Sequence, residues 1–251
     1  MTLDDYRHLH RFFVGADSIV GGEVTVVGSA ARQIAKVLRL GSGDRIGVLD
    51  GSGVVHIVRL STVAEDMVNG DIVATETVET EPRISLTVAA ALTKGDRMEF
   101  ALQKCTELGA CEFIIFSSKR TVVKPDARSV ERRLERWRSI VKEAAEQSSR
   151  AVVPSVRGIV SAEELAGVIS GYDLAICLWE EETSRKIKSI ISQKREFRSI
   201  LIIVGPEGGF EENEVRMFEK VGAVSATLGP RVLRSETAAV AAVAIILNEL
   251  G

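Results

Sequence analysis

Short runs of alternating apolar and polar residues occupy the first third of the chain and predict β-strands. Four of these runs cover Glu23–Val27, Asp44–Asp50, Val54–Leu60 and Asp71–Val78. The sequence "DGSG" between the second and third runs predicts a hairpin turn, because its glycines adopt positive φ at little cost. Closely spaced short strands of this kind predict a small barrel.

One amphipathic helix is expected among these strands. In "SAARQIAKVLRL", Ile34, Val37 and Leu38 fall on one apolar stripe at helical spacing. Ser29 precedes the stripe and is the expected N-cap, because its hydroxyl can accept a hydrogen bond from the first turn.

The second part of the chain begins after a candidate linker, "ETEPR" (Glu79–Arg83), which separates an expected domain at residues 1–78 from another at 82–251. Here apolar runs alternate with amphipathic helices. Ile84–Leu92 is almost continuously apolar, as in strands covered on both faces, and "EFIIF" follows one helix later. Such a βαβ unit predicts a parallel sheet and an α/β fold.

The helix inside this βαβ unit carries start and stop signals. Asp96 and Glu99 form a D-x-x-E capping box, and Gly109 is expected to end the helix. The residues expected to be buried, at helical spacing, are Met98, Ala101, Leu102, Cys105 and Leu108.

Helices and strands continue to alternate to the end of the chain. Helices are expected at Ser129–Gln147 and from Ser161, with strands at Tyr172–Trp179, Ser199–Gly205 and Ser225–Gly229. The last segment, "TAAVAAVAIILNELG", is apolar on nearly every side. Such a helix must be buried, either in the core or against a second subunit.

Composition adds limits on the class of protein. The chain has 251 residues, of which 45% are hydrophobic and 27% charged, as in globular proteins of one large or two modest domains. No apolar run approaches the ~20 residues that span a bilayer, and the N-terminus lacks the basic-then-apolar order of an export signal. We expect a cytoplasmic protein. The three cysteines and three histidines have no disulfide-like or metal-like spacing, so no metal is expected.

Charge is distributed unevenly along the chain. The net charge of −3 alone argues against a nucleic-acid-binding protein. Between Lys119 and Arg157, however, eleven basic residues stand against five acidic ones, and between Thr183 and Ile200 six stand against one. A local basic surface can bind a polyanion, although a solvated helix face is the alternative.

The glycine-rich sequence "GPEGG" (Gly205–Gly209) lies between an expected strand and an expected helix, where phosphate sites are common. It lacks the Lys and Ser/Thr of a P-loop and the spacing of a dinucleotide fingerprint, and Glu207 would repel phosphate. Glycine permits close approach and Pro206 fixes one φ, so a neutral or cationic ligand fits better. A purely structural turn is the alternative.

A second corner, "LGPRVLRSETAA" (Leu228–Ala239), repeats the order of strand, Gly-Pro turn and helix. If the two strands are neighbours in a parallel sheet, both corners meet at its carboxyl edge, where open α/β folds bind ligands. Arg234 and Glu236 follow the turn and could pair at the surface. Against this, a stray charge just before a buried helix would be costly.

Several segments together resemble the RsmE family of the SPOUT superfamily, whose members are bacterial 16S ribosomal RNA uridine-N3 methyltransferases. The segments occur in the family's order and span nearly the whole chain. The two corner motifs are the most specific of them. The six segments that carry the resemblance are "HRFFV" (His10–Val14), "KVLRLGSGD" (Lys36–Asp44), "ALTKGDRMEFALQKCTELG" (Ala91–Gly109), "ERWRSIVKEAAEQSSR" (Glu135–Arg150), "GPEGGFEENEV" (Gly205–Val215) and "LGPRVLRSETA" (Leu228–Ala238).

The resemblance implies a PUA-like β-barrel that helps to hold RNA, followed by a SPOUT methyltransferase domain with a trefoil knot. It also implies a homodimer that uses S-adenosyl-L-methionine to methylate N3 of a uridine in 16S ribosomal RNA. The cofactor would lie in three loops. Carried onto this sequence, they contain Leu178, Trp179, Glu180, Gly205, Pro206, Glu207, Gly208, Gly209, Leu228, Gly229, Val232 and Leu233.

The reaction indicates which side chains to expect around the uracil. Its N3 proton must leave, so the site needs a base, or a cation that stabilises the developing anion. Arg234 is the expected cation, and Glu236 the expected base or the partner that orients Arg234. The expected RNA contacts are Arg11, Arg39, Lys94, Arg97, Lys104, Arg120 and Arg150.

Two positions depart from the family pattern. Gln33 stands where members often have a histidine, which weakens any role for that side chain. Glu211 stands where Ser or Thr is favoured as a helix cap, although a carboxylate still suits a helix N-terminus. The alternatives are a related knotted methyltransferase acting on transfer RNA and a non-catalytic RNA-binding or ribosome-assembly factor. The intact corner motifs favour a catalyst.

Overall fold

The structure, a computed structural model, describes residues 8–121, 127–192 and 196–251. The chain forms two compact units. The first contains the residues up to Glu81 together with Ala145–Val153, and the second contains Pro82–Ala144 and Pro154–Gly251. The division therefore falls inside one helix, α3 (Ala127–Gln147).

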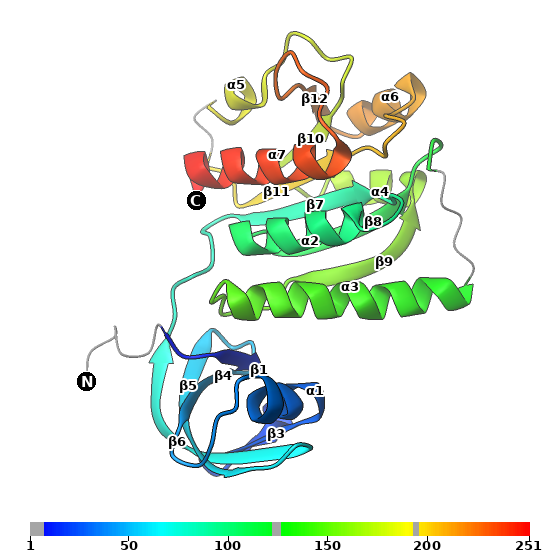
Figure 1. The fold of residues 1–251 in the computed structure, drawn as a ribbon. Coiled ribbons are helices and arrows are strands. Elements are labelled where there is room, and N and C mark those ends of the chain that lie inside the picture. Colours follow the sequence, from blue (N-terminus) through cyan, green and yellow to red (C-terminus); the bar gives the residue numbers. More distant parts are fainter. Residues whose placement is uncertain (1–7, 122–126, 193–195) are drawn as a thin grey trace. The chain divides into compact units, whose positions relative to one another are not determined.

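The first unit is a curled six-stranded sheet (Figure 1). The strand order is β1-β4-β5-β6-β3-β2, and every neighbouring pair is antiparallel except β1 with β4. The hairpin turn expected at "DGSG" is confirmed, since it joins antiparallel β4 and β5, with Gly51 and Gly53 at positive φ. The strands are β1 (Arg11–Phe13), β2 (Ile19–Val20), β3 (Glu23–Val27), β4 (Arg45–Leu49), β5 (Val54–Val63) and β6 (Met67–Thr77).

The helical segment of this unit differs from the expected regular helix. A short helix, α1 (Gly28–Arg32), runs directly into a π-helical turn, η3 (Gln33–Val37). Ser29 lies within the helix, so it is not the cap. Ile34 is buried as expected, but Val37 is 71% exposed. The wider π-helical turn moves Val37 off the stripe that the 3.6-residue repeat predicts.

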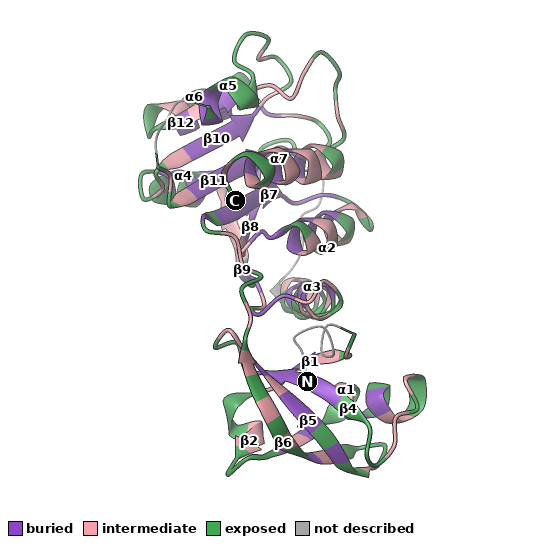
Figure 2. Ribbon diagram, turned by 90° about the vertical axis from the view of Figure 1, so that its left-hand side faces the viewer, coloured by how far each residue is buried: buried purple, intermediate pink, exposed green. Residues whose placement is uncertain are grey.

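The second unit is a mixed α/β fold around a six-stranded sheet whose neighbouring strands are all parallel, which confirms the expected fold class. The strand order is β12-β10-β11-β7-β8-β9. The inner strands β7, β10 and β11 are almost entirely buried because helices cover both faces, whereas the edge strand β9 is largely half-buried (Figure 2). The strands of this sheet are β7 (Ser85–Ala91), β8 (Glu112–Ser117), β9 (Ser155–Ser161), β10 (Leu174–Leu178), β11 (Ser199–Val204) and β12 (Ala223–Ala226).

The helices of this unit form two layers. α7 (Ser235–Leu250) and α2 (Arg97–Leu108) lie side by side on one face of the sheet, and α4 (Ala162–Ile169) and α6 (Glu212–Lys220) lie on the other (Figures 1 and 2). A short helix, α5 (Ile187–Ile191), contacts α7. Under α4 and α6, the rings of Phe116, Phe210 and Phe218 pack with centroids 5.9 to 6.4 Å apart. This aromatic cluster anchors the start of α6 below the first glycine corner.

The start of α2 differs from the prediction. Asp96 is the N-cap, but its side chain makes no capping hydrogen bond, because its ψ of 1° is not the extended value that capping requires. Glu99 binds Arg136 instead, at 2.7 Å. Gly109 ends the helix with a φ of 116°, as expected. Leu108, expected to be buried, is 39% exposed.

The capped start expected for α4 is confirmed. Ser161 Oγ accepts from the Glu164 backbone N–H at 3.1 Å, and Glu164 accepts from the Ser161 N–H at 2.7 Å. No helix within the described residues combines the length and apolar character needed to cross a bilayer.

Candidate active site

Both glycine corners lie at the carboxyl edge of the parallel sheet, on either side of the loop that follows β10. The strands before the corners, β11 and β12, each pair with β10 from opposite sides. The expectation that these two strands are neighbours is therefore wrong. The corners still meet, because all three strands run in the same direction and end at the same edge.

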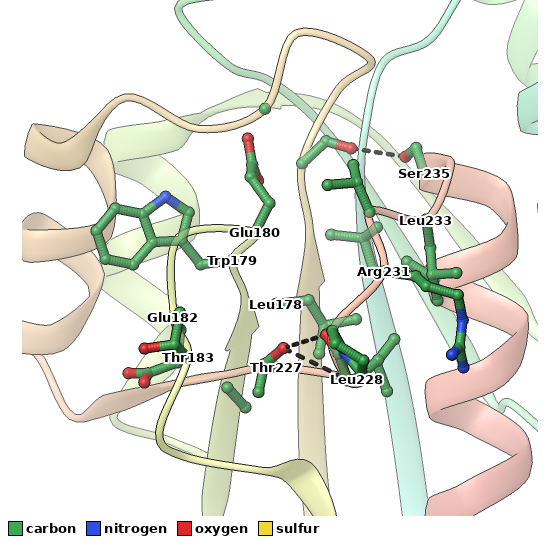
Figure 3. Close-up of a pocket in the computed structure, with 18 of the residues that line it drawn as sticks. Leu178, Trp179, Glu180, Glu182, Thr183, Thr227, Leu228, Arg231, Leu233 and Ser235 are labelled. Atoms are coloured by element: carbon green, nitrogen blue, oxygen red, sulfur yellow. Dashed lines mark hydrogen bonds between the residues drawn. The ribbon is translucent and has the colours of Figure 1, made fainter.

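A pocket of about 530 Å³ opens between these three loops (Figure 3). It contains all the residues expected to bind the cofactor except Glu207 and Gly208. The lining residues are Leu178, Trp179, Glu180, Glu182, Thr183, Lys186, Val204, Gly205, Pro206, Gly209, Ala226, Thr227, Leu228, Gly229, Pro230, Arg231, Val232, Leu233, Ser235 and Ala238.

The glycines of this pocket are required by its geometry. Gly209 has a φ of 69°, in the left-handed region, and a Cβ there would come within 1.7 Å of Glu180 Oε1. A Cβ at Gly205 would lie 3.0 Å from the Phe210 ring. Ser235 Oγ donates to the Gly205 carbonyl at 2.6 Å and ties the second corner to the first (Figure 3). Backbone groups rather than side chains therefore form much of the wall.

The loop after β10 is fixed by an ionic network around Arg185. Its guanidinium donates to Glu182 at 2.8 Å and to Glu219 at 3.0 Å, and it also binds Ser225, which is buried. Hydrogen bonds from Ser184 and then from Arg185 hold the pKa of Glu182 well below its usual range. A hydrogen bond from Ser225 is the main cause that lowers the pKa of Glu219.

The same loop is joined to the strand edge that leads into the second corner. The Thr227 N–H donates to the Arg185 carbonyl at 2.9 Å, and the Ile187 N–H donates to the Thr227 carbonyl at 3.1 Å. Thr227 Oγ1 in turn donates to the Gly229 carbonyl at 3.1 Å. The network thus holds two of the three walls of the pocket in one arrangement.

A second, more open cleft of about 820 Å³ adjoins the corners. It is lined by Lys94, Gly95, Asp96, Arg97, Phe100, Glu207, Arg234, Glu236 and Thr237. The two cavities share a wall, since Pro206 and Gly209 face the pocket and Glu207 faces the cleft. In the same way, Leu233 and Ser235 face the pocket while Arg234 and Glu236 face the cleft.

Glu207 is placed differently from the prediction. It lines the cleft, where its Oε1 accepts from the Lys94 N–H at 3.0 Å and from Arg97 Nη1 at 3.1 Å. The positive charge expected beside Glu207 is therefore supplied by Arg97 and not by a ligand. Gly208 also lies outside the pocket, and its carbonyl accepts from Arg120 Nη1 at 3.0 Å.

Arg234 and Glu236, the expected catalytic pair, both line the cleft. Arg234 is exposed, so the argument that a charge there would be costly does not hold. No ion pair joins the two side chains in the described part of the chain. Among the described residues, Glu236 Oε2 is buried without a hydrogen-bond partner. A carboxylate oxygen without a hydrogen-bond partner is stabilised by a ligand that donates a hydrogen bond to it.

The residues expected to contact RNA fall into different environments. Lys94 and Arg97 lie in the cleft with Arg234, and Arg120 is exposed beside Gly208. Lys104 is half-exposed and pairs with Glu107 at 2.7 Å.

The remaining three lie in the first unit. Arg39 is exposed, and Arg11 is half-buried, with Nη1 donating to the Ser149 carbonyl at 2.8 Å. Arg150 is only 3% exposed and forms an ion pair with Glu81. Its prediction as an RNA contact is therefore wrong, because its charge is used inside the fold.

Some residues that line the two cavities were not predicted, because no sequence motif identified them. In the pocket these include Thr183, Lys186 and Thr227. Phe100 and Thr237 of the cleft lie inside quoted motifs, but nothing in those motifs singled them out. Two others could have been found from the sequence. Glu182 belongs to an acidic run directly after an expected strand, and Ser235 lies inside the second corner motif.

Comparison with known proteins gives consistent matches. A family described as RNA methyltransferase domain matches residues 80–247. The ribosomal RNA small subunit methyltransferase E of Bacillus subtilis (strain 168) is 35% identical over 226 residues, which cover 88% of this chain and 88% of that protein.

Two solved structures extend this similarity to the fold. The ribosomal RNA small subunit methyltransferase E of Neisseria gonorrhoeae bound to S-adenosyl methionine has a TM-score of 0.88 and 31% identity, over 97% of this chain and 99% of that one. A Legionella pneumophila methyltransferase in complex with the bound cofactor SAM has a TM-score of 0.88 and 26% identity, over 96% and 98%.

Proposed function

The chain belongs to the ribosomal RNA small subunit methyltransferase E family, and from this membership we propose that it methylates N3 of one uridine in 16S ribosomal RNA. The protein is a methyltransferase that uses S-adenosylmethionine and acts on small-subunit ribosomal RNA. What we propose beyond this activity is that the methylated base is a uridine and that the methylated atom is its N3.

The pocket between the three loops is the observation that carries the proposal. Leu178, Leu228 and Leu233 offer apolar surface for an adenine ring, and the two glycine corners offer backbone groups for its edge. Glu180 can face the amino group and the sulfonium, and Arg231 the carboxylate, on different sides of the pocket (Figure 3). A nucleoside with both signs of charge fits this lining better than a phosphate.

The adjoining cleft supplies the groups that act on the uracil. When bound, S-adenosylmethionine supplies an electrophilic methyl group, and its sulfur leaves as a thioether with the bonding electron pair. The Glu236 carboxylate, which lines the cleft, accepts the N3 proton. Arg234 stabilises the negative charge that develops on the uracil oxygens as N3 attacks.

Basic residues around the cleft are proposed to hold the RNA strand. Lys94 and Arg97 line the cleft, and Arg120 donates to the Gly208 carbonyl. Lys104 of the second unit and Arg11 and Arg39 of the first unit are proposed as further RNA contacts. The first unit is proposed to be a PUA-like RNA-holding domain, and the second unit a SPOUT domain with a trefoil knot. The placement of β11 and β12 on opposite sides of β10 supports such a crossing chain path.

A homodimer is also proposed, in the cytoplasm. The support comes from α7, which buries Ala239, Ala242, Val243 and Ile246 on one side. Its opposite side carries Ala241 and Ala244, which are half-exposed. Small residues let a second helix approach closely.

Mass-spectrometric mapping of small-subunit RNA tests the function. RNA from cells without the protein is incubated with the purified protein and labelled S-adenosylmethionine. One N3-methyluridine is expected to form at one position. Label on another atom would contradict the N3 assignment, and label only on transfer RNA would contradict the substrate.

A further inference from the structure

We propose that the second cleft binds the target pyrimidine unstacked, with its face against the ring of Phe100. The inference rests on the proposed function and adds to it the residue that holds the base. Phe100 lies on α2, in the same cleft as Arg234 and Glu236.

The exposure of Phe100 is unusual in this fold. Its side chain is 46% exposed, and it is the one aromatic among the large apolar residues that are exposed in the described chain. Its neighbours on the helix, Met98, Ala101 and Leu102, are buried in the core. A phenyl ring left in water loses hydrophobic free energy that a flat ligand would recover.

The surroundings of the ring match a nucleotide. Lys94 and Arg97 bring positive charge for phosphates, and Arg234 brings a cation for the uracil oxygens. Glu236 lines the same cleft and has a carboxylate oxygen without a hydrogen-bond partner. Single-stranded RNA is commonly bound by this combination, in which aromatic rings stack on bases and cations follow the backbone. The N3 atom takes part in base pairing, so an enzyme that modifies it must first separate the base from its partner.

The shared wall brings this base close to the cofactor pocket. Only the two corners separate the cavities, and the glycines there carry no side chains that would thicken the wall. A base stacked on Phe100 therefore lies in the cavity next to the methyl donor, with its edge toward the residues at the start of α7.

A second copy of the chain could also cover an exposed ring. The composition of the cleft argues for RNA instead. Six charged residues line it with Phe100, namely Lys94, Asp96, Arg97, Glu207, Arg234 and Glu236. The centres of protein interfaces are depleted in Lys, Asp and Glu, whereas nucleic-acid sites are rich in cations beside aromatic rings.

Three substitutions at Phe100 distinguish the effect of an aromatic face from the effect of apolar volume. Phe100→Ala removes the ring, Phe100→Leu keeps an apolar side chain without an aromatic face, and Phe100→Tyr keeps the face. Leu108→Ala, at the other exposed apolar position of α2, is the matched control. Each variant is assayed on small ribosomal subunits that lack the modification, with S-adenosylmethionine affinity measured by calorimetry.

The expected result follows from the strength of base stacking. Phe100→Ala and Phe100→Leu lower kcat/KM for the subunits by about 5-fold to 100-fold, while Phe100→Tyr and Leu108→Ala stay within about threefold of wild type. Cofactor affinity stays unchanged in all four variants. Full activity of Phe100→Leu would overturn the proposal, because apolar bulk would then suffice.

Two further outcomes would also overturn it. Loss of cofactor binding in Phe100→Ala would make the ring structural. A shift of that variant from dimer to monomer in analytical ultracentrifugation, with a matching loss of activity, would assign the ring to a subunit interface.

Crosslinking provides a direct readout that does not depend on turnover. Small-subunit RNA substituted with 5-iodouridine is irradiated on the protein, and the tryptic peptide Met98–Lys104 is expected to carry the crosslinked base. A crosslink elsewhere would contradict the stacking. Absence of methylation by the wild-type protein would instead contradict the proposed function, so the two failures are distinguishable.

Discussion

Adjacent residues in each corner face different cavities. Pro206 and Glu207 lie on opposite sides of the first corner, and Leu233 and Arg234 on opposite sides of the second. Side chains of extended backbone alternate in direction, so a few residues can line both sites at once. A substitution at one position can therefore affect one ligand and spare the other.

This separation gives a prediction for Arg234. Arg234→Ala is expected to lower kcat by about 100-fold or more, because the charge that develops on the uracil loses its cation. Cofactor affinity should stay within a few-fold, since the side chain faces the cleft. The measurement is single-turnover methylation together with calorimetry. Arg216→Ala, on the exposed side of α6, is the control, and unchanged turnover in Arg234→Ala would discard the assignment.

Gly209 is expected to be intolerant of a side chain. Gly209→Ala should destabilise the fold by about 1–2 kcal/mol, because its φ of 69° is unfavourable for alanine. It should also weaken cofactor binding, because Glu180 must move away from the new methyl group. Urea unfolding and calorimetry test both effects. Gly167→Ala in α4, where the added Cβ meets nothing within 4 Å beyond its chain neighbours and the backbone of its own helix, should keep or raise stability.

Single residues were predictable where a local motif defines them. Gly205, Gly209, Leu228 and Leu233 of the pocket lie in the two corner motifs, whereas Leu178 was expected only from the family resemblance. Glu207 and Arg150 were misplaced because their partners are distant in sequence. Arg97 lies 110 positions from Glu207, and Glu81 lies 69 positions from Arg150. Local patterns contain no information about such pairs.

At the scale of elements, the loop between β10 and α5 depends on Arg185. Arg185→Ala is expected to weaken S-adenosylmethionine binding by about tenfold, because Glu182 and Glu219 would then repel each other across Ser225. The KM for RNA should change little. Titration calorimetry measures the first effect and steady-state assays the second. Equal losses for both substrates would indicate general unfolding.

The outward side of α7 gives a second prediction at this scale. Ala244→Glu is expected to convert the proposed dimer to a monomer, because it adds bulk and charge where a partner helix would approach. Light scattering after size exclusion measures the mass. Ala16→Glu, at an exposed site in the first unit, should leave the mass unchanged. A wild-type monomer at micromolar concentration would refute the dimer.

Elements with clear periodicity were predictable, and their spatial order was not. Five of the six strands of the second unit lie within a few residues of the predicted apolar runs, whereas β9 was not predicted. The insertion of β10 between β11 and β12 cannot be read from any run, because strand order depends on how the whole chain crosses the sheet. The predicted place of Val37 on the apolar stripe was wrong for a local reason, because the π-helical turn shifts this residue off the stripe.

At the scale of the whole molecule, the mildly acidic chain is expected to bind RNA through local charge. Affinity for small-subunit RNA should fall roughly tenfold or more between about 50 and about 200 mM salt, because bound cations are released from the phosphates. Fluorescence anisotropy at several salt concentrations gives the slope. Lys94→Ala should reduce that slope. An affinity that does not depend on salt would argue against an RNA substrate.

The first unit is not one continuous stretch of chain. Its core combines Phe13, Leu49 and Ile57 with Ala145 and Ala151, and the Phe13 N–H donates to Glu146. A gene cut after codon 81 would thus encode a curled sheet that lacks part of its hydrophobic core, with Glu81 deprived of Arg150. Isolating this half for ribosome-binding work therefore requires a graft of residues 145–153, and domain shuffling at the linker alone would yield an aggregation-prone fragment.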